Sequence, residues 1–303
     1  GDLSNGVAPG YPSDLLNAGD VISLDNDVSV PSSAIFFDGA DKIVASFPVV
    51  MTRAAIPTGP GALQAGAMEA LPIERWGTSY VAPVGVNTRD SNSMFQYNAL
   101  YVMARTDNTV CAIDPDPART GEPGEGTQTL NEGKTLVVEN VHDGGTVDCD
   151  KNVHVDQITG DIGVNYETRW FSLTPTSRLA NDYYGPVGNP RDKGETFVYV
   201  HNPTGSSMTV QCQTDAGSCG SRTLSPGETW RTSRIPDGSG VRVFSNNAGD
   251  RFAALSVIDY GGQIYDWGYT LEPRKELSTQ ALVGLGLGCT NSNSCDRSRS
   301  VIW

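Results

Sequence analysis

Apolar and polar residues alternate along much of this chain in short runs, which is the pattern of β-strands. In TFVYVH at 196–201, aromatic and histidine positions alternate with Val198 and Val200, and a period of two separates the faces of a strand. Such runs end in loops rich in Asn, Asp, Gly and Pro, as in RTDNT at 105–109 and HNPTGSS at 201–207. The pattern therefore predicts an all-β fold of short antiparallel strands.

A phrase of the form Leu-x-x-Gly occurs three times, in LLNAGDVISL at 15–24, TLNEGKTLVV at 129–138 and TLSPGETWRT at 223–232. After each phrase comes an Asp that opens a strand-like run, and then an aromatic–Gly pair: Trp76-Gly77, Tyr184-Gly185 and Trp267-Gly268. The resulting unit of about 90 to 110 residues is too long for a propeller blade and suits a small sandwich. A chance likeness among glycine-rich β sequences is the alternative. We predict tandem antiparallel β-sandwich-like repeats.

These repeats predict three modules, at residues 1–95, 96–190 and 191–303, of which the first and the last hold incomplete repeats. In each phrase the Leu is expected to face inward, and the Gly to permit a turn with positive φ. The chain ends in the apolar run RSVIW at 299–303. Two interpretations stay open. Either the chain is an excerpt of a longer array, or incomplete ends complete one another between neighbouring subunits by strand addition.

The succession LNAGDVISL, DKIVASFPVVM, LPIERWGTSYVAPVG, ALYVMARTDNTVCAI and LNEGKTLVV resembles the IgGFc-binding-protein N-terminal domain family. The resemblance covers residues 15 to about 280 and is best in the first 140. In the second repeat DIGVNYETRWF departs from it, because a more polar run replaces an apolar strand. That family occurs in mucus-associated animal proteins and in large bacterial surface proteins. The resemblance implies extracellular β architecture and adhesion or matrix roles rather than a reaction.

Six cysteines add a prediction about the compartment. Cys212 and Cys219 bracket QTDAGS, and Cys289 and Cys295 bracket TNSNS, which predicts two short hairpins with disulfides at their bases. The remaining cysteines, Cys111 and Cys149, would pair by elimination, although six cysteines allow fifteen connectivities. A zinc site is the alternative, but neither short pair has C-x-x-C spacing and no His is near. Disulfide-pinned loops indicate an oxidising, extracellular setting.

Charge and composition exclude several classes of partner. The net charge is −14 with 21 Lys and Arg residues, and an acidic surface repels the phosphates of nucleic acids. No run of about 18 apolar residues is present, so no membrane span is expected. With 34 Gly and 18 Pro, the composition points away from helices. The start GDLSNGVAPGY has neither a basic nor an apolar stretch, and no signal peptide is expected there.

Acidic loops suggest calcium as the one cofactor to consider. DPDPARTGEPGEG at 114–126 begins with Asp114 and Asp116, and DCDKNVHVD at 148–156 begins with Asp148 and Asp150. A Cys111–Cys149 bond would bring the two segments together, and oxygen-rich loops suit a hard cation. The spacing is not that of an EF-hand, and a solvated acidic loop is the alternative. We treat the four aspartates as weak calcium candidates.

No catalytic residues are predicted. A G-x-S-x-G elbow is missing from the sequence, and we expect the three histidines, His142, His154 and His201, at ordinary surface positions. The favoured function is that of an extracellular or cell-surface adhesin or filament subunit, which binds copies of itself through β-strand contacts.

Two other functions are weighed against the favoured one. A glycan- or protein-binding β module would use Trp170, Trp230 and Tyr260 as stacking platforms, unless these rings lie in the core. A secreted hydrolase is the least favoured function, since it would need a cleft with clustered polar groups.

Overall fold

The computed structural model describes residues 17–18, 43–55, 66–88, 94–161, 168–186, 195–259 and 267–280. The chain divides into two compact units, residues 39–280 with Trp303, and residues 1–38 with 281–302. Apart from Asn17 and Ala18, the second unit lies outside the described residues. The first Leu-x-x-Gly phrase, the Cys289–Cys295 pair and the run RSVIW fall there too, so the predictions about them are not tested.

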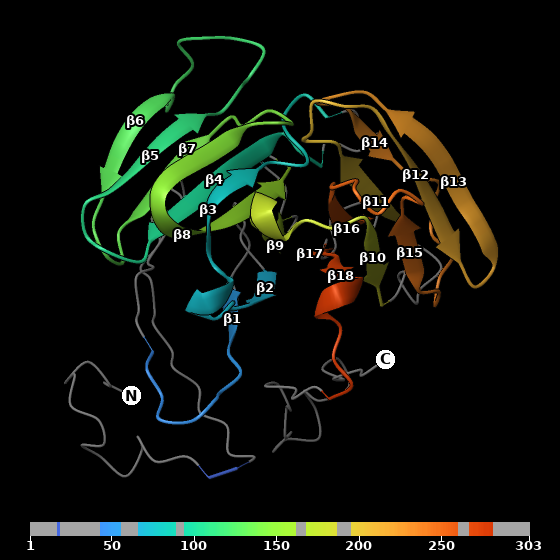
Figure 1. Cartoon of the computed structure of the whole chain (residues 1–303), viewed down its shortest axis with the longest axis horizontal. Helices are drawn as coiled ribbons and strands as arrows, with labels where there is room; N and C mark the ends of the chain where they lie inside the picture. The colour runs from blue at the N-terminus through green and yellow to red at the C-terminus, as the bar shows by residue number, and fades with distance from the viewer. Residues whose placement is uncertain are drawn as a thin grey trace. The chain divides into compact units, whose positions relative to one another are not determined.

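The described residues are almost entirely β-strand, and every sheet pairing among them is antiparallel. The predicted all-β fold is confirmed. Apart from the two-stranded sheet of β1 (Thr52–Ala55) and β2 (Gly66–Glu69), the strands form two groups, which we call sandwich A and sandwich B, and Figure 1 draws A from cyan to yellow-green and B from yellow to red. Sandwich A consists of β3 (Gly77–Val81), β4 (Tyr97–Ala104), β5 (Thr109–Asp114), β6 (Gly126–Leu130), β7 (Thr135–Glu139), β8 (Thr146–Gly160) and β9 (Thr168–Ser172).

Sandwich A is organised around the long strand β8. The first part of β8 pairs with β3 and β5, and its last part pairs with β4 and β9. One strand thus serves two layers, ordered β6-β5-β8-β3 and β7-β4-β8-β9. Val147, Val153 and Val155 of β8 are fully buried in the core between these layers. Branched side chains pack well on a pleated surface that is covered, which explains why this long run stays a strand.

Sandwich B has the same strand order, with two strands in place of β8. Its sheets are β13-β12-β15-β10-β18 and β14-β11-β16-β17. The core contains Val200, Val210, Val243 and Phe252. The strands are β10 (Asp182–Gly185), β11 (Glu195–His201), β12 (Met208–Thr214), β13 (Gly217–Leu224), β14 (Thr229–Arg231), β15 (Val241–Phe244), β16 (Ala253–Asp259), β17 (Trp267–Thr270) and β18 (Glu272–Pro273).

The predicted module boundaries at residues 95 and 190 remain a prediction, but the sheets group the strands differently. Strand β3 precedes residue 95 and pairs with β8 of sandwich A. Strand β10 precedes residue 190 and pairs with β15 and β18 of sandwich B.

The two Leu-x-x-Gly phrases within the described residues behave as expected. Leu130 and Leu224 are buried, and Gly133 and Gly227 have φ angles of 72° and 73°.

A hairpin, a proline and a 3₁₀ turn follow one another three times, and we call these segments joints 1, 2 and 3. Joint 1 is the hairpin of β1 (Thr52–Ala55) and β2 (Gly66–Glu69), then Pro72 and η2 (Ile73–Arg75). Joint 2 is the end of β8 with β9, then Pro175 and η3 (Thr176–Arg178). Joint 3 is β16 with β17, then Pro273 and η4 (Arg274–Glu276). Each proline has a φ near −60°, the value that its ring imposes, and so sets the turn that ends the hairpin.

The joints agree in their hydrogen bonds as well. In each, the amide two residues before the proline donates to a carbonyl at the start of the hairpin's other arm. These bonds are Ala70 to Met51 at 3.0 Å, Leu173 to Val155 at 2.9 Å and Leu271 to Ala254 at 3.0 Å.

Counted from the prolines, Trp76-Gly77 corresponds to Leu179-Ala180, so the predicted match with Tyr184-Gly185 is wrong. Gly77 begins β3, whereas Gly185 ends β10.

Joints 1 and 2 are each followed by a tyrosine with the same role. The Tyr80 hydroxyl accepts the Gly77 amide at 2.8 Å and donates to the Val153 carbonyl at 2.7 Å. In sandwich B the Tyr183 hydroxyl accepts the Ala180 amide at 2.8 Å and donates to the Phe252 carbonyl at 2.6 Å. Burial raises the pKa of both hydroxyls above the ordinary range, because it disfavours the phenolate. Each tyrosine therefore satisfies two buried backbone groups.

Tyr80→Phe and Tyr183→Phe are each expected to lower the free energy of unfolding by about 2 kcal/mol, because each leaves a buried amide and a buried carbonyl without a partner. Urea denaturation of the full chain measures this change. Tyr97→Phe is the control, since its hydroxyl bonds to the Tyr101 hydroxyl at 2.9 Å and its loss should cost about 1 kcal/mol or less. Equal losses in all three variants would contradict the assigned role.

Candidate functional site

The three joints lie side by side, with joint 2 between the others. Strand β9 packs against both β2 and β17. The Ser172 hydroxyl lies 3.4 Å from the Glu69 carbonyl, and the Thr270 hydroxyl donates to the Ser172 carbonyl at 2.7 Å. All three residues stand third before the proline of their joint. The same position in successive joints thus forms a short chain of polar contacts.

The three 3₁₀ turns also meet, through the residue third after each proline. Arg75 Nη2 lies 3.1 Å from Glu276 Oε2, and Arg178 Nη2 lies 3.1 Å from the same oxygen. Burial would raise the pKa of the Glu276 carboxyl, but Arg178 and Arg75 outweigh it and hold this pKa below the ordinary range. One carboxylate therefore neutralises an arginine from each of the other two joints.

An open cleft of about 270 Å³ lies where the joints meet, and we call it the joint cleft. It takes residues from all three joints and from β10, so it exists only because the joints are stacked. Its wall includes both charged and aromatic side chains. These are Glu69, Arg75, Trp170, Arg178, Tyr184, Tyr269, Glu272 and Glu276.

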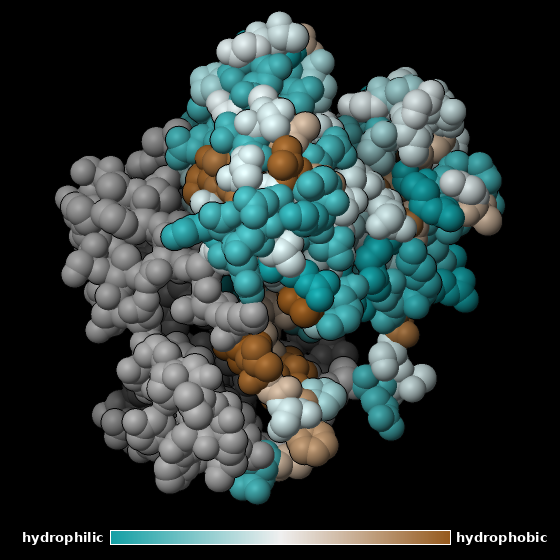
Figure 2. All heavy atoms as spheres, turned by 60° about the vertical axis from the view of Figure 1, so that its left-hand side comes forward, coloured by the Kyte–Doolittle hydropathy of each residue, from teal (hydrophilic) through white to brown (hydrophobic). Residues whose placement is uncertain are grey.

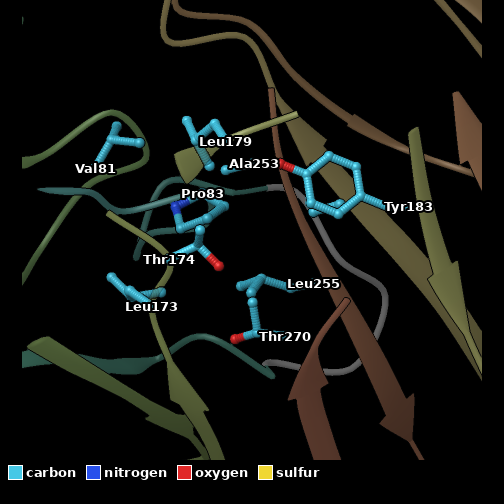
Figure 3. Close-up of a pocket in the computed structure, with 10 residues that line it drawn as sticks. Val81, Pro83, Leu173, Thr174, Leu179, Tyr183, Ala253, Leu255 and Thr270 are labelled. Carbon is cyan, nitrogen blue, oxygen red and sulfur yellow. The ribbon is translucent and has the colours of Figure 1, made fainter. Parts of the chain in front are cut away.

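A second cavity, between the two sandwiches, is too small for a ligand. It measures about 10 Å³, which is room for about one water molecule. Figure 3 shows its apolar walls, with Val81 and Leu173 from sandwich A, Leu255 from sandwich B and Leu179 from the segment that connects them. The space marks a closely packed seam rather than a binding site.

The calcium candidates do not converge on one point. Asp114 Oδ1 accepts the Asp116 amide at 3.2 Å, and Asp150 Oδ1 accepts the Val110 amide at 2.8 Å. Asp116 is buried, and its Oδ2 lies 3.2 Å from His142 Nδ1 without the geometry of a hydrogen bond. Asp148 lies on β8, opposite Ser79 and Ala112. In the part of the chain that the structure describes, no three His, Cys, Asp or Glu residues are grouped to hold a metal ion. Calcium binding stays a prediction.

Two of the predicted disulfides are present. Cys111 bonds to Cys149 and joins β5 to β8 of sandwich A. Cys212 bonds to Cys219 and closes the hairpin of β12 and β13. Each sandwich therefore has one covalent link between neighbouring strands.

The prediction that the histidines are at the surface is wrong for two of them. His154 and His201 are buried, with exposed fractions of 8% and 1%. His154 Nε2 lies 2.8 Å from Asp156 Oδ1, and the same oxygen accepts the Ser172 hydroxyl at 2.9 Å. A serine nucleophile needs its base on its own hydroxyl, whereas here both groups bond to the carboxylate. The contacts satisfy His154 Nε2 and the Ser172 hydroxyl, whereas His154 Nδ1 is buried without a hydrogen-bond partner among the described residues.

Comparison with models of protein families gives a match over residues 3–257, and the matched model is described as IgGFc binding protein. The chain belongs to the IgGFc-binding-protein family. The resemblance seen in the sequence is therefore confirmed. Comparisons with curated proteins and with solved structures found no match.

Membership in the IgGFc-binding-protein family gives the broad class of function. It is a family of binding proteins, and together with the two disulfides it indicates an extracellular binding module. Among the described residues no helix is long and apolar enough to cross a membrane.

The aromatic residues proposed as glycan platforms in this IgGFc-binding-family chain lie mostly in the core. Trp170 and Trp230 have exposed fractions of 5% and 8%, so their faces are not open to a sugar ring. Tyr260 lies outside the described residues. Trp267, which the sequence did not single out as a platform, is 45% exposed on β17. An alternating pattern places a ring on a strand, but it does not tell whether a second layer covers that ring.

Proposed function

We propose that this chain is an extracellular adhesive module in which a stiff tandem of β-sandwiches presents surfaces to protein ligands. The observation that carries the proposal is the shared packing of the two sandwiches. Phe197, Tyr199, Leu255 and Val257 of sandwich B belong to the same buried cluster as the core of sandwich A. A junction without a free linker resists bending, which suits a structural or adhesive role.

A protein ligand fits this proposal better than a glycan. The chain is strongly acidic, and Figure 2 shows a face that is mostly hydrophilic, with hydrophobic residues in smaller groups. Acidic surfaces steer partners with basic patches. Trp170 and Trp230, which a sugar would need as platforms, are buried. The name of the family makes the Fc fragment of immunoglobulin G the first ligand to test.

Assembly with copies of itself by strand addition is the finer form of the proposal. The segments 1–30 and 296–303, which would dock on a neighbour, lie outside the described residues. An apolar stretch before β1 favours association, since Val44 and Phe47 are 75% and 80% exposed. In this form the chain is a filament subunit or cell-surface adhesin.

Binding to immobilised Fc fragment, measured by biolayer interferometry with the full chain, tests the proposal. We expect a dissociation constant on the order of 1 μM or below, and no binding to Fab fragment as the matched control. Negative-stain microscopy of the same sample tests self-assembly by separating filaments from single molecules. Monomers that bind neither Fc nor any other protein offered would contradict the proposal.

A further inference from the structure

The charges of the joint cleft do not balance. Glu276 is shared by Arg75 and Arg178, so these arginines are already paired. Glu69 and Glu272 also line the cleft, and no ion pair joins either of them to a basic side chain of the described residues. The cleft therefore presents two carboxylates whose charge is not directly neutralised.

The surroundings of Glu272 oppose its negative charge. Glu272 is exposed on β18, yet partial burial of its carboxyl raises its pKa above the ordinary range, and the nearby carboxylates of Glu69 and Glu276 act in the same direction. Arg75 and Arg178 act in the opposite direction without overcoming these effects. A cation that enters the cleft would be stabilised by the same carboxylates that now repel one another.

Aromatic rings in the cleft wall already contact cations of the chain itself. Guanidinium groups of the chain already lie over two of these rings, Arg242 at 5.7 Å from the centre of Tyr184 and Arg53 at 5.8 Å from that of Trp170. Cations bind over aromatic faces because the ring quadrupole is negative there. The volume of about 270 Å³ lies just below the range of drug-sized ligand sites, about 300 Å³ and above, so it fits one long side chain.

We propose that the joint cleft receives a basic side chain, arginine or lysine, from a protein partner. This inference rests on the proposed function, namely that the chain binds proteins, and adds the chemistry of the contact. The partner's cation lies between Glu69 and Glu272, and its methylene groups pack on Tyr184 and Tyr269. Joint 1 supplies Glu69, joint 3 supplies Glu272 and Tyr269, and β10 supplies Tyr184.

A titration of the full chain with arginine amide, followed by NMR, tests the site without any knowledge of the partner. We expect saturable binding with a dissociation constant on the order of 1 mM, and none for citrulline amide, which has the same shape and the same α-ammonium group but an uncharged side chain. Glu272→Gln and Glu69→Gln should each weaken binding at least about tenfold. Glu74→Gln is the matched control, since Glu74 is exposed on η2 outside the cleft wall and its loss should leave binding unchanged.

The outcomes separate this inference from the proposed function. Failure of arginine amide to bind the unmodified chain, or equal weakening by Glu74→Gln, would overturn the basic side-chain site even where a protein ligand is bound elsewhere. Binding of arginine amide without any protein ligand would leave the site standing and overturn the proposed function. Loss of Fc binding or of self-association in Glu272→Gln, with no such loss in Glu74→Gln, would support both the basic side-chain site and the proposed function.

Discussion

Replacing Cys111 and Cys149 together with alanine is expected to lower the free energy of unfolding by about 4 kcal/mol. The two cysteines are 38 residues apart, and a link over a loop of that length removes much entropy from the unfolded chain. The same double replacement of Cys212 and Cys219, which are 7 residues apart, is expected to cost about 2 kcal/mol. Guanidinium denaturation under non-reducing conditions measures both changes.

A reductant provides the control for these two variants. The unmodified chain under full reduction should lose at least as much stability as the two double variants together, since the links lie in different sandwiches, their effects should add, and reduction also breaks the predicted Cys289–Cys295 link. Comparison of the two losses tests whether closing a loop of the unfolded chain is the main contribution of these disulfides. If the Cys212/Cys219 variant lost as much as the Cys111/Cys149 variant, loop closure would not be the main contribution of these links.

Local signals in the sequence predicted the strands and the turns. The Leu-x-x-Gly phrase is enough to predict the burial of Leu130 and Leu224 and the positive φ of Gly133 and Gly227. These features depend on only a few neighbouring residues. Cysteine spacing predicted the Cys212–Cys219 hairpin for the same reason. Each of these features involves contacts that are close in the chain.

The burial of the histidines could not be predicted from alternation. Strand β11 alternates aromatic and valine residues, yet all of its residues after Glu195 are buried. One face of β11 packs in the core of sandwich B and the other in the core shared with sandwich A. A strand covered on both faces reads as a near-continuous apolar run, as in FVYV at 197–200, whereas the alternation of aromatic and valine residues was taken for two different faces. His201 was therefore expected at the surface and lies inside.

The joint cleft could not be predicted either, because it depends on the stacking of three distant segments. The turns that follow Pro72, Pro175 and Pro273 have the sequences IER, TSR and RKE, which share little beyond the proline before them. Only the structure brings Arg75, Arg178 and Glu276 to one place. The prolines at a regular spacing were the signal that could have been used.

His201 is expected to make the folded chain sensitive to acid between pH 6.5 and 4. It is 1% exposed on β11, and burial lowers its pKa to about 4, against a small opposite effect of Asp143. Its Nδ1 lies 3.0 Å from the Thr229 hydroxyl, which donates to the Pro83 carbonyl at 3.1 Å and so connects sandwich B to the loop after β3. This arrangement accommodates a neutral ring at the contact of the two sandwiches.

Because the folded pKa is below the unfolded value of 6.5, the unfolded chain binds the proton more readily. The contribution of His201 to stability is therefore complete above pH 6.5 and is lost as the pH falls to about 4, by about 3 kcal/mol in total. Urea denaturation of the unmodified chain and of His201→Gln, at pH 7, 5.5 and 4, measures this loss, and the variant should lose about 3 kcal/mol less over the range.

His142→Gln serves as the comparison, since His142 is partly exposed near Asp116 and its replacement should keep most of the acid sensitivity. The free energy of unfolding of His201→Gln could instead fall as steeply with decreasing pH as that of the unmodified chain. That result would mean that His201 takes up its proton in the folded state. The tightly packed seam would then have to open around a charged ring, which the 1% exposure of this side chain argues against.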